Sequence, residues 1–164
     1  MNAAADRFAS QGIGSYFLYT NEAHPGENYP PLTSMVQKFR HATALRDVYG
    51  VARPILVDSL DGACHRAYGS MPNMTWIFSR TGTVLYKSDW THVASVVDML
   101  EYLQKLPERR KSGARLSPFQ VQRVEYRESD GNAFYDGLAR NGQQAVDDFA
   151  RTFPQSVPKD WPRE

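Results

Sequence analysis

Apolar residues along the chain fall into short continuous runs separated by stretches with helical spacing. Tyr16 to Thr20 and Pro54 to Asp58 are runs with almost no alternation, which is typical of strands buried on both faces of a largely parallel sheet. Helix-forming residues at 2–11, an apolar stripe within 33–48 and a short stretch at 61–68 predict three helices around these strands. Helices that alternate with buried strands predict an α/β fold.

The helix at 33–48 is expected to begin at an N-cap, Thr33 or Ser34. His41 lies outside its apolar stripe, so the pattern favours a solvated histidine there. The side chains expected to face inward are Met35, Val36, Phe39, Ala42 and Leu45.

Farther along the chain the pattern changes. Thr75 to Ser79 and Thr83 to Lys87 are two β-rich runs separated by a short turn that ends in Gly82, which predicts a hairpin. An amphipathic helix capped by Thr91 follows. Its expected inward side chains are Val93, Val96, Val97, Leu100 and Leu103. Parallel strands followed by a hairpin and a packing helix are similar to the order of a thioredoxin-like domain.

Composition divides the chain into three parts. Residues 1–106 form the predicted α/β domain, and the basic, polar stretch 107–117 is expected to be a linker. The appendage at 118–164 contains two short helical patterns, at 132–140 and 143–153. Four apolar residues are expected to pack it back onto the domain: Phe134, Leu138, Val146 and Phe149. Three prolines in 154–164 predict an extended or disordered tail.

Charge and hydropathy exclude several classes of partner. The 164 residues carry a formal net charge of only +1, and Lys and Arg are spread along the chain, so we expect no nucleic-acid partner. No apolar run approaches the length that spans a bilayer, and the first residues lack the pattern of a signal peptide. We therefore expect no membrane span and a cytoplasmic location.

Glu22 and His24 follow the first strand, within a loop that holds three prolines between Asn21 and Leu32. A carboxylate and an imidazole on one turn can share a proton or orient one another, as general acid/base chemistry requires. In the alternative interpretation, Glu22 caps a backbone amide and His24 is a solvated turn residue. The spacing leaves both interpretations open.

Cys64 is the only cysteine of the sequence, which excludes an internal disulfide and a cysteine-rich zinc site. It lies in the first turn of the short helix at 61–68, where the helix N-terminus and neighbouring cations can activate a thiol. In the other interpretation Cys64 shares a face with Ala67 and Tyr68 and is packed in the core. His24, His41, His65 and His92 show no metal-ligand spacing, so no metal is expected.

A family resemblance rests on several of these segments. Tyr19 to Gly26 (Tyr-Thr-Asn-Glu-Ala-His-Pro-Gly) resembles the Tyr-Ile-Glu-Glu-Ala-His-Pro segment of the iodothyronine deiodinase family, and Leu56 to Asp61 is similar to its Val-Leu-Asp-Thr-Met segment. Three further segments continue the match in the same order, within about residues 5 to 105: Ala67 to Gly69, Trp76 to Phe78 and Val84 to Lys87.

The resemblance implies a thioredoxin-like fold and a reductive activity. Members of the family use a selenocysteine or cysteine nucleophile to remove iodine from thyroid hormones, and bacterial relatives are uncharacterised redoxins. Glu22 and His24 correspond to the acidic and histidine residues beside that nucleophile, with His24 in substrate or proton handling. Pro72 matches the place of a cis-proline that exposes backbone to substrate, although trans is the usual form.

A second histidine of the family lies in an Ile-Pro-Gln-His segment after the loop. Aligned on Pro30 and Pro31, it falls at about Thr33, and His41 lies one to two helical turns later. We therefore include His41 with Pro72 as expected substrate-binding residues. The reaction would need an external thiol as reductant and no other cofactor.

The family's nucleophile lies on a loop roughly thirty residues before the Glu-Ala-His block, after the central strand. Counting back from Glu22 passes the first residue before that point, so we expect a thioredoxin-like fold that is incomplete at the N-terminus. Cys64 is then the candidate substitute thiol.

Two functions follow from this expectation. One is a deiodinase-like oxidoreductase that acts on a small molecule or a thiol. The other is a noncatalytic module whose incomplete sheet binds a strand-donating partner or a second copy of the chain.

Overall fold

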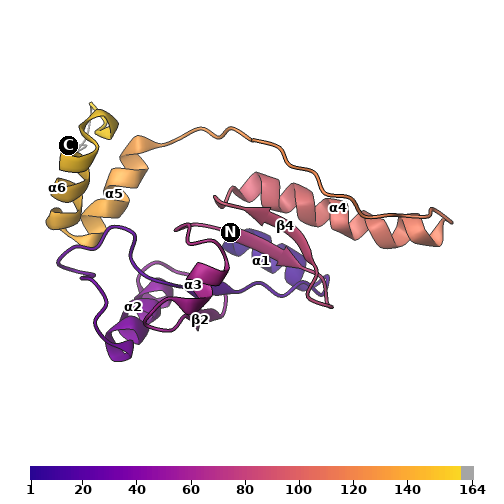
Figure 1. Ribbon diagram of the computed structural model, residues 1–164, viewed down its shortest axis with the longest axis horizontal. Coiled ribbons are helices and arrows are strands. Elements are labelled where there is room, and N and C mark those ends of the chain that lie inside the picture. Colours follow the sequence, from indigo (N-terminus) through magenta and orange to yellow (C-terminus); the bar gives the residue numbers. More distant parts are fainter. Residues whose placement is uncertain (160–164) are drawn as a thin grey trace. The chain divides into compact units, whose positions relative to one another are not determined.

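The computed structural model describes residues 1–159, which form a mixed α/β structure with six α-helices and two separate two-stranded sheets (Figure 1). These residues divide into two compact units. The first unit comprises Met1, Ala3–Ile13 and Met71–Arg127, and the second comprises Asn2, Gly14–Ser70 and the chain from Glu128 onward. The α/β class predicted from the sequence is confirmed.

The first unit is a hairpin packed with two helices. Strands β3 (Thr75–Phe78) and β4 (Val84–Ser88) pair antiparallel, as predicted, with an irregularity after Ile77. Helices α1 (Asn2–Ala9) and α4 (Val93–Lys111) supply the buried side chains Phe8, Val96 and Leu100, and Ile77 and Tyr86 pack against them. The hairpin therefore obtains its apolar cover from helices at both ends of this unit's sequence.

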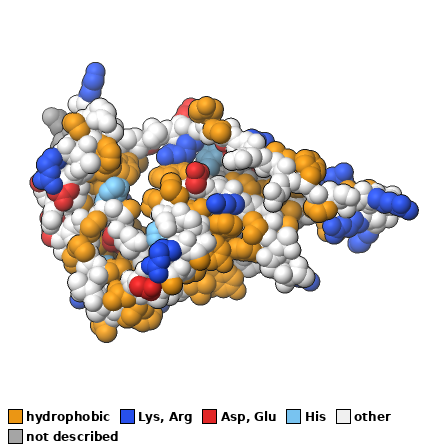
Figure 2. Space-filling view, viewed as in Figure 1, with side chains coloured by type: hydrophobic (Ala, Val, Ile, Leu, Met, Phe, Trp, Pro, Cys, Tyr) orange, Lys and Arg blue, Asp and Glu red, His pale blue; other side chains and the backbone are white. Residues whose placement is uncertain are grey.

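Helix α4 differs from its prediction at both ends. The N-cap is His92, without a side-chain cap, while the hydroxyl of Thr91 lies 2.7 Å from that of Thr75. The helix continues through Pro107 to Lys111, into the stretch expected to be a linker. Residues 108–111 are good helix formers, and three cations in the last turn interact favourably with the helix C-terminus. Figure 2 shows a cluster of blue side chains at that end.

The longest helix in the described part of the chain is therefore strongly charged at one end. Neither α4 nor any other helix within residues 1–159 is both long and apolar enough to cross a membrane.

The second unit contains a short parallel sheet. Strand β1 (Phe17–Tyr19) pairs with β2 (Ile55–Val57), with Leu18 opposite Leu56. Helices α2 (Met35–Asp47) and α3 (Ala63–Ala67) follow the strands. The side chain of Leu56 is 52% exposed, so the prediction that β2 is buried on both faces was wrong. A two-stranded sheet has no inner strand, and each strand is an edge.

The same unit ends in a helical hairpin of α5 (Gly131–Asn141) and α6 (Gln143–Thr152), as predicted. Tyr135, Leu138 and Val146 are buried between the two helices. A single 3₁₀ turn at Pro154–Ser156 replaces the expected extended start of the tail. The rest of the tail expectation, for residues 160–164, lies outside the described residues.

Helix α2 buries a different face from the one its apolar stripe predicts. Val36 is 82% exposed and Phe39 is 54% exposed, whereas Lys38, His41 and Ala42 are buried. Ser34 caps the helix, as predicted, because its hydroxyl oxygen accepts a hydrogen bond from the amide of Gln37. The interpretation of His41 as a solvated residue was wrong. Lys38 bonds to the Ser59 carbonyl after β2, and His41 lies beside the Tyr19 hydroxyl of β1.

The first unit's core yields a stability prediction. Phe8 is 1% exposed, so Phe8→Ala leaves a cavity and should lower the free energy of unfolding by about 3 to 5 kcal/mol. Phe119→Ala removes the same atoms from a side chain that is 83% exposed and should change it by less than about 0.5 kcal/mol. Urea unfolding followed by circular dichroism measures both, and equal effects would contradict the core assignment.

Candidate functional site

Three polar side chains are joined by hydrogen bonds at the carboxyl end of β1. The Tyr19 hydroxyl donates to Glu22 Oε1 at 2.8 Å and lies 3.3 Å from His41 Nδ1. The phenolic hydrogen is committed to the carboxylate, so His41 Nδ1 must carry the hydrogen that it donates to the Tyr19 oxygen. We call Tyr19, Glu22 and His41 the acid/base group.

His41 is the buried end of the acid/base group. The residue is 3% exposed, and its Nε2 is buried without a hydrogen-bond partner among residues 1–159. With Nδ1 protonated, the neutral ring has its acceptor lone pair on Nε2. Burial lowers the pKa of His41, although the charge of Glu22 opposes this shift. The ring is therefore neutral at physiological pH, with an available basic nitrogen.

Two cavities adjoin this group, and Glu22 lines both. The smaller one, about 110 Å³, is also lined by Tyr29, His41, Tyr49 and Asn141. Burial raises the pKa of Tyr49 to about 12, and a hydrogen bond with Tyr29 adds to the effect, so this phenol stays protonated. The smaller cavity thus brings hydroxyl, amide and imidazole groups and the apolar side chain of Leu45 beside one carboxylate.

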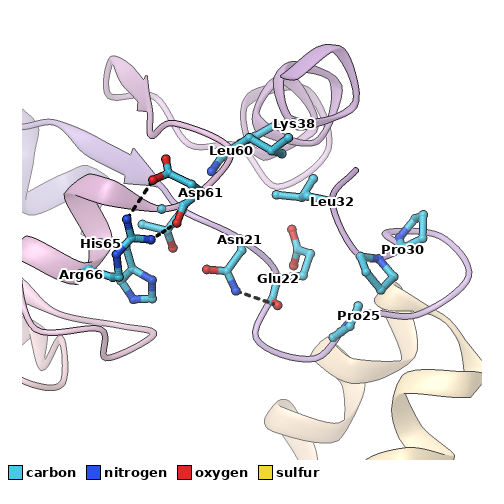
Figure 3. Close-up of a pocket in the computed structure, with 13 residues that line it drawn as sticks. Asn21, Glu22, Pro25, Pro30, Leu32, Lys38, Leu60, Asp61, His65 and Arg66 are labelled. Atoms are coloured by element: carbon cyan, nitrogen blue, oxygen red, sulfur yellow. Dashed lines mark hydrogen bonds and ion pairs between the residues drawn. The ribbon is translucent and has the colours of Figure 1, made fainter. Parts of the chain in front are cut away.

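The larger cavity, about 300 Å³, lies at the carboxyl ends of β1 and β2, where α/β proteins generally bind ligands. In Figure 3, Asp61 and Arg66 lie along one side, and Pro25, Pro30 and Leu32 along the other. Arg66 is held by a salt bridge of 2.8 Å to Asp61. The cavity therefore combines an apolar wall with charged groups.

Lys38 reaches the larger cavity from α2. It is 1% exposed, and its Nζ donates to the carbonyl of Ser59 at 2.7 Å. Burial lowers the pKa of Lys38, and the nearby charges of Asp58 and Asp61 oppose that shift. A buried ammonium needs such partners, because desolvation of an unpaired charge is costly.

Asp58 organises the end of β2. Its carboxylate accepts from the amides of Ser59 at 2.8 Å, Cys64 at 3.0 Å and His65 at 2.9 Å. Burial acts to raise the pKa of Asp58, but the three amides and Lys38 outweigh it and hold the pKa below its ordinary value. Asp58 thus supplies the cap of α3, whose own N-cap is Gly62.

Cys64 lies in the first turn of α3 and is partly buried. Burial raises its thiol pKa, and the charge of Asp58 adds to this effect. The thiolate is the nucleophilic form. The local electrostatics therefore oppose activation of Cys64, in contrast to the expectation from its place near a helix N-terminus.

His24 and Glu22 are not joined by a hydrogen bond in the described structure. The His24 ring forms T-shaped contacts with Phe134 and Phe149, at centroid distances of 5.8 and 5.1 Å. Burial lowers the pKa of His24. The structure thus brings Glu22 to Tyr19 and His41, while His24 packs against the α5–α6 hairpin.

The remaining predicted site residue, Pro72, belongs to the first unit. It is exposed in the turn before β3, next to Asn73, which forms a bridge with Trp90. Within residues 1–159, no three His, Cys, Asp or Glu side chains group closely enough to hold a metal ion.

The sequence patterns did not single out Tyr19, Lys38 or Asp58 as site residues. Tyr19 and Glu22 are three positions apart at a strand end, and Lys38 and His41 are three apart on a helix, where they share a face. Asp58 directly follows an apolar strand. These spacings were visible, but an apolar stripe on α2 favoured the opposite face.

Comparison with known proteins found no matching family model, no similar curated protein and no similar solved structure.

Asp58 yields a pH prediction. Because its folded pKa lies below its unfolded value of about 4, the stabilisation is complete above that pH and is lost as the pH falls through the folded pKa. Asp58→Asn should cost about 2 kcal/mol at pH 7 and flatten the acid limb of the stability profile. Urea unfolding from pH 2 to 7 measures this. Asp98→Asn, at an exposed position of α4, is the control and should keep the wild-type acid limb. An acid limb of Asp58→Asn equal to that of the wild type would contradict the assignment.

Proposed function

We propose that the chain is a thiol-dependent oxidoreductase of the deiodinase-like type, with a thioredoxin-like fold. The observation that carries this proposal is the acid/base group at the carboxyl end of β1. Two of its members, Tyr19 and Glu22, belong to the segment that resembles the iodothyronine deiodinase family. His41 completes the group from α2.

The proposed reaction replaces iodine on an aromatic ring by hydrogen. One thiolate takes the iodine as the proton goes to the ring carbon, and a second thiolate displaces iodide and forms a disulfide. Overall, an aryl iodide and two thiols give the arene, a disulfide, iodide and a proton. The electrons come from an external thiol, and the acid/base group delivers the proton.

The geometry suits a proton transfer between the two cavities. Glu22 lines both of them, and Tyr19 connects it to His41, whose Nε2 has an available lone pair. When the Nε2 lone pair takes a proton from the thiol, the Nδ1 proton can move to the Tyr19 oxygen and the phenolic proton to Glu22. The apolar wall of the larger cavity would receive the aromatic ring.

Cys64 is the remaining candidate thiol of this chain. Its raised pKa makes it a weak nucleophile, so we assign the thiolate role to the external thiol. Cys64→Ser should leave the rate within about twofold, because the substitution changes neither the acid/base group nor its charge.

The decisive measurement is iodide release from an iodinated phenol by the full chain with dithiothreitol. Tyr19→Phe, Glu22→Gln and His41→Gln should each lower the rate about 100-fold, as expected for loss of general acid/base catalysis. His92→Gln, a matched substitution at an exposed position of the first unit, should leave it unchanged. Release by the wild-type chain no faster than by dithiothreitol alone would refute the proposal.

A second function is favoured by a separate observation. In the part of the chain that the structure describes, both strands of the parallel sheet have unpaired outer edges, and Leu56 and Phe39 of the same unit are exposed. Parallel sheets are normally covered on both faces. A noncatalytic module would use such an edge to accept a strand from a second chain.

Sedimentation velocity separates this second function from the first. A strand-accepting module should self-associate or bind a partner, and Leu56→Lys should weaken the association at least tenfold by placing a charge in the contact. Val124→Lys, at an exposed position of the first unit, is the control. A monomer at all concentrations, alone and with cell extract, would contradict strand acceptance.

A further inference from the structure

The loop that follows Glu22 is bonded to the turn between α5 and α6. Asn141 Nδ2 donates to the carbonyl of His24 at 2.7 Å, and the Asn141 carbonyl accepts from the amide of Asn28 at 2.9 Å. One residue of the hairpin therefore holds both ends of the segment between His24 and Asn28.

The loop in turn caps the hairpin. Glu27 accepts from the amides of Gln143 at 2.7 Å and Gln144 at 3.0 Å. The N-cap of α6 is Gly142, which has no side chain to perform this role. Asn28 Nδ2 also donates to the carbonyl of Arg140 at 3.1 Å. Helix ends that lack their own caps need such partners, so each segment satisfies polar groups of the other.

The approach of the two segments is close enough to require a glycine. Gly26 is buried, and a Cβ atom there would lie 2.4 Å from the Asn141 carbonyl oxygen. A backbone atom cannot yield as the end of a flexible side chain can. The contact between the loop and the hairpin is therefore specific in shape as well as in hydrogen bonding.

Asn141 also lines the smaller cavity, together with Glu22 and His41. We propose that Asn141 is a positioning residue, which fixes the loop after Glu22 and so keeps the Glu22 carboxylate beside Tyr19 and His41. Glu22 lies between two fixed points, the end of β1 and the His24 carbonyl. The expected effect of Asn141 on catalysis rests on the proposed function, whereas its effect on the loop rests on these contacts alone.

The test replaces the amide donor by a group that donates only when protonated. In Asn141→Asp, the ionised carboxylate has no hydrogen to give and repels the His24 carbonyl, whereas the protonated carboxyl can donate again. Hydrogen-exchange protection of the amides at 22–28 should fall about tenfold at pH 8 and recover towards pH 5. Wild-type protein at each pH is the reference.

Several charges surround the introduced carboxyl and set where it titrates. Glu22 faces it across the cavity, with His41 and the phenols of Tyr29 and Tyr49. The negative charge of Glu22 and burial both raise the pKa of the introduced carboxyl, and the positive charge of Arg140 lowers it. Glu27 and the buried ring of His24 lie in the bonded loop. The pKa of Glu27 is held low mainly by backbone amides, including those of Gln144 and Gln143, so the α6 cap persists at pH 5.

A glycine pair tests the same contact without a new charge. Gly26→Ala should force the loop and hairpin apart and raise exchange at 22–28 and at the start of α6 about tenfold or more. Gly137→Ala places the same methyl in α5, where no described atom beyond the helix's own backbone lies within 4 Å, and should leave both segments unchanged. If Asn141→Asp does not fold, the comparison of these two glycine variants tests the contact between the loop and the hairpin on its own.

Iodide release separates the positioning role from the proposed reaction. If Asn141 acts through Glu22, Asn141→Asp should lower kcat at pH 8 at least tenfold with little change in KM, and kcat should recover towards pH 5 relative to wild type. If exchange in the variants changes as expected but the wild-type protein releases no iodide, the loop contact is supported and only the proposed reaction is refuted. Unchanged exchange in both Asn141→Asp and Gly26→Ala refutes the positioning role.

Discussion

The second unit depends on the hydrogen bonds that backbone amides donate to one buried carboxylate, that of Asp58. Three backbone amides bind it at the end of β2, and this fixes where α3 begins. Its negative charge also stabilises the buried ammonium of Lys38, which bonds to the adjacent Ser59 carbonyl. One carboxylate therefore connects a strand end, a helix start and a side chain from α2.

The rotation of α2 follows from this connection. Lys38 and His41 are three residues apart and share a helix face, so burial of Lys38 also directs His41 inward, where it meets Tyr19. The same rotation leaves Val36 and Phe39 exposed. The acid/base group thus follows from helix geometry combined with the burial of Lys38, which bonds to the Ser59 carbonyl near the charge of Asp58. The same arrangement leaves apolar side chains of α2 exposed.

The comparison with the sequence is most informative at these residues. The hairpin of β3 and β4, the helices α5 and α6 and the short apolar strands were predictable, because local spacing and turn residues determine them. The buried face of α2 was not predictable, because the spacing of apolar residues gives no information about polar partners that lie far along the chain. Glu22 was identified as a candidate, but its actual partners, Tyr19 and His41, depend on tertiary contacts.

The contact between the loop and the α5–α6 hairpin has a further consequence for how affinity arises. The hairpin follows α4 after a stretch from Ser112 to Asp130 without helix or strand, and its contact with the loop lies within one chain. Two segments joined in one chain have an effective concentration for each other that can be on the order of millimolar. Hydrogen bonds that would be too weak between separate molecules can then keep the loop occupied almost all of the time.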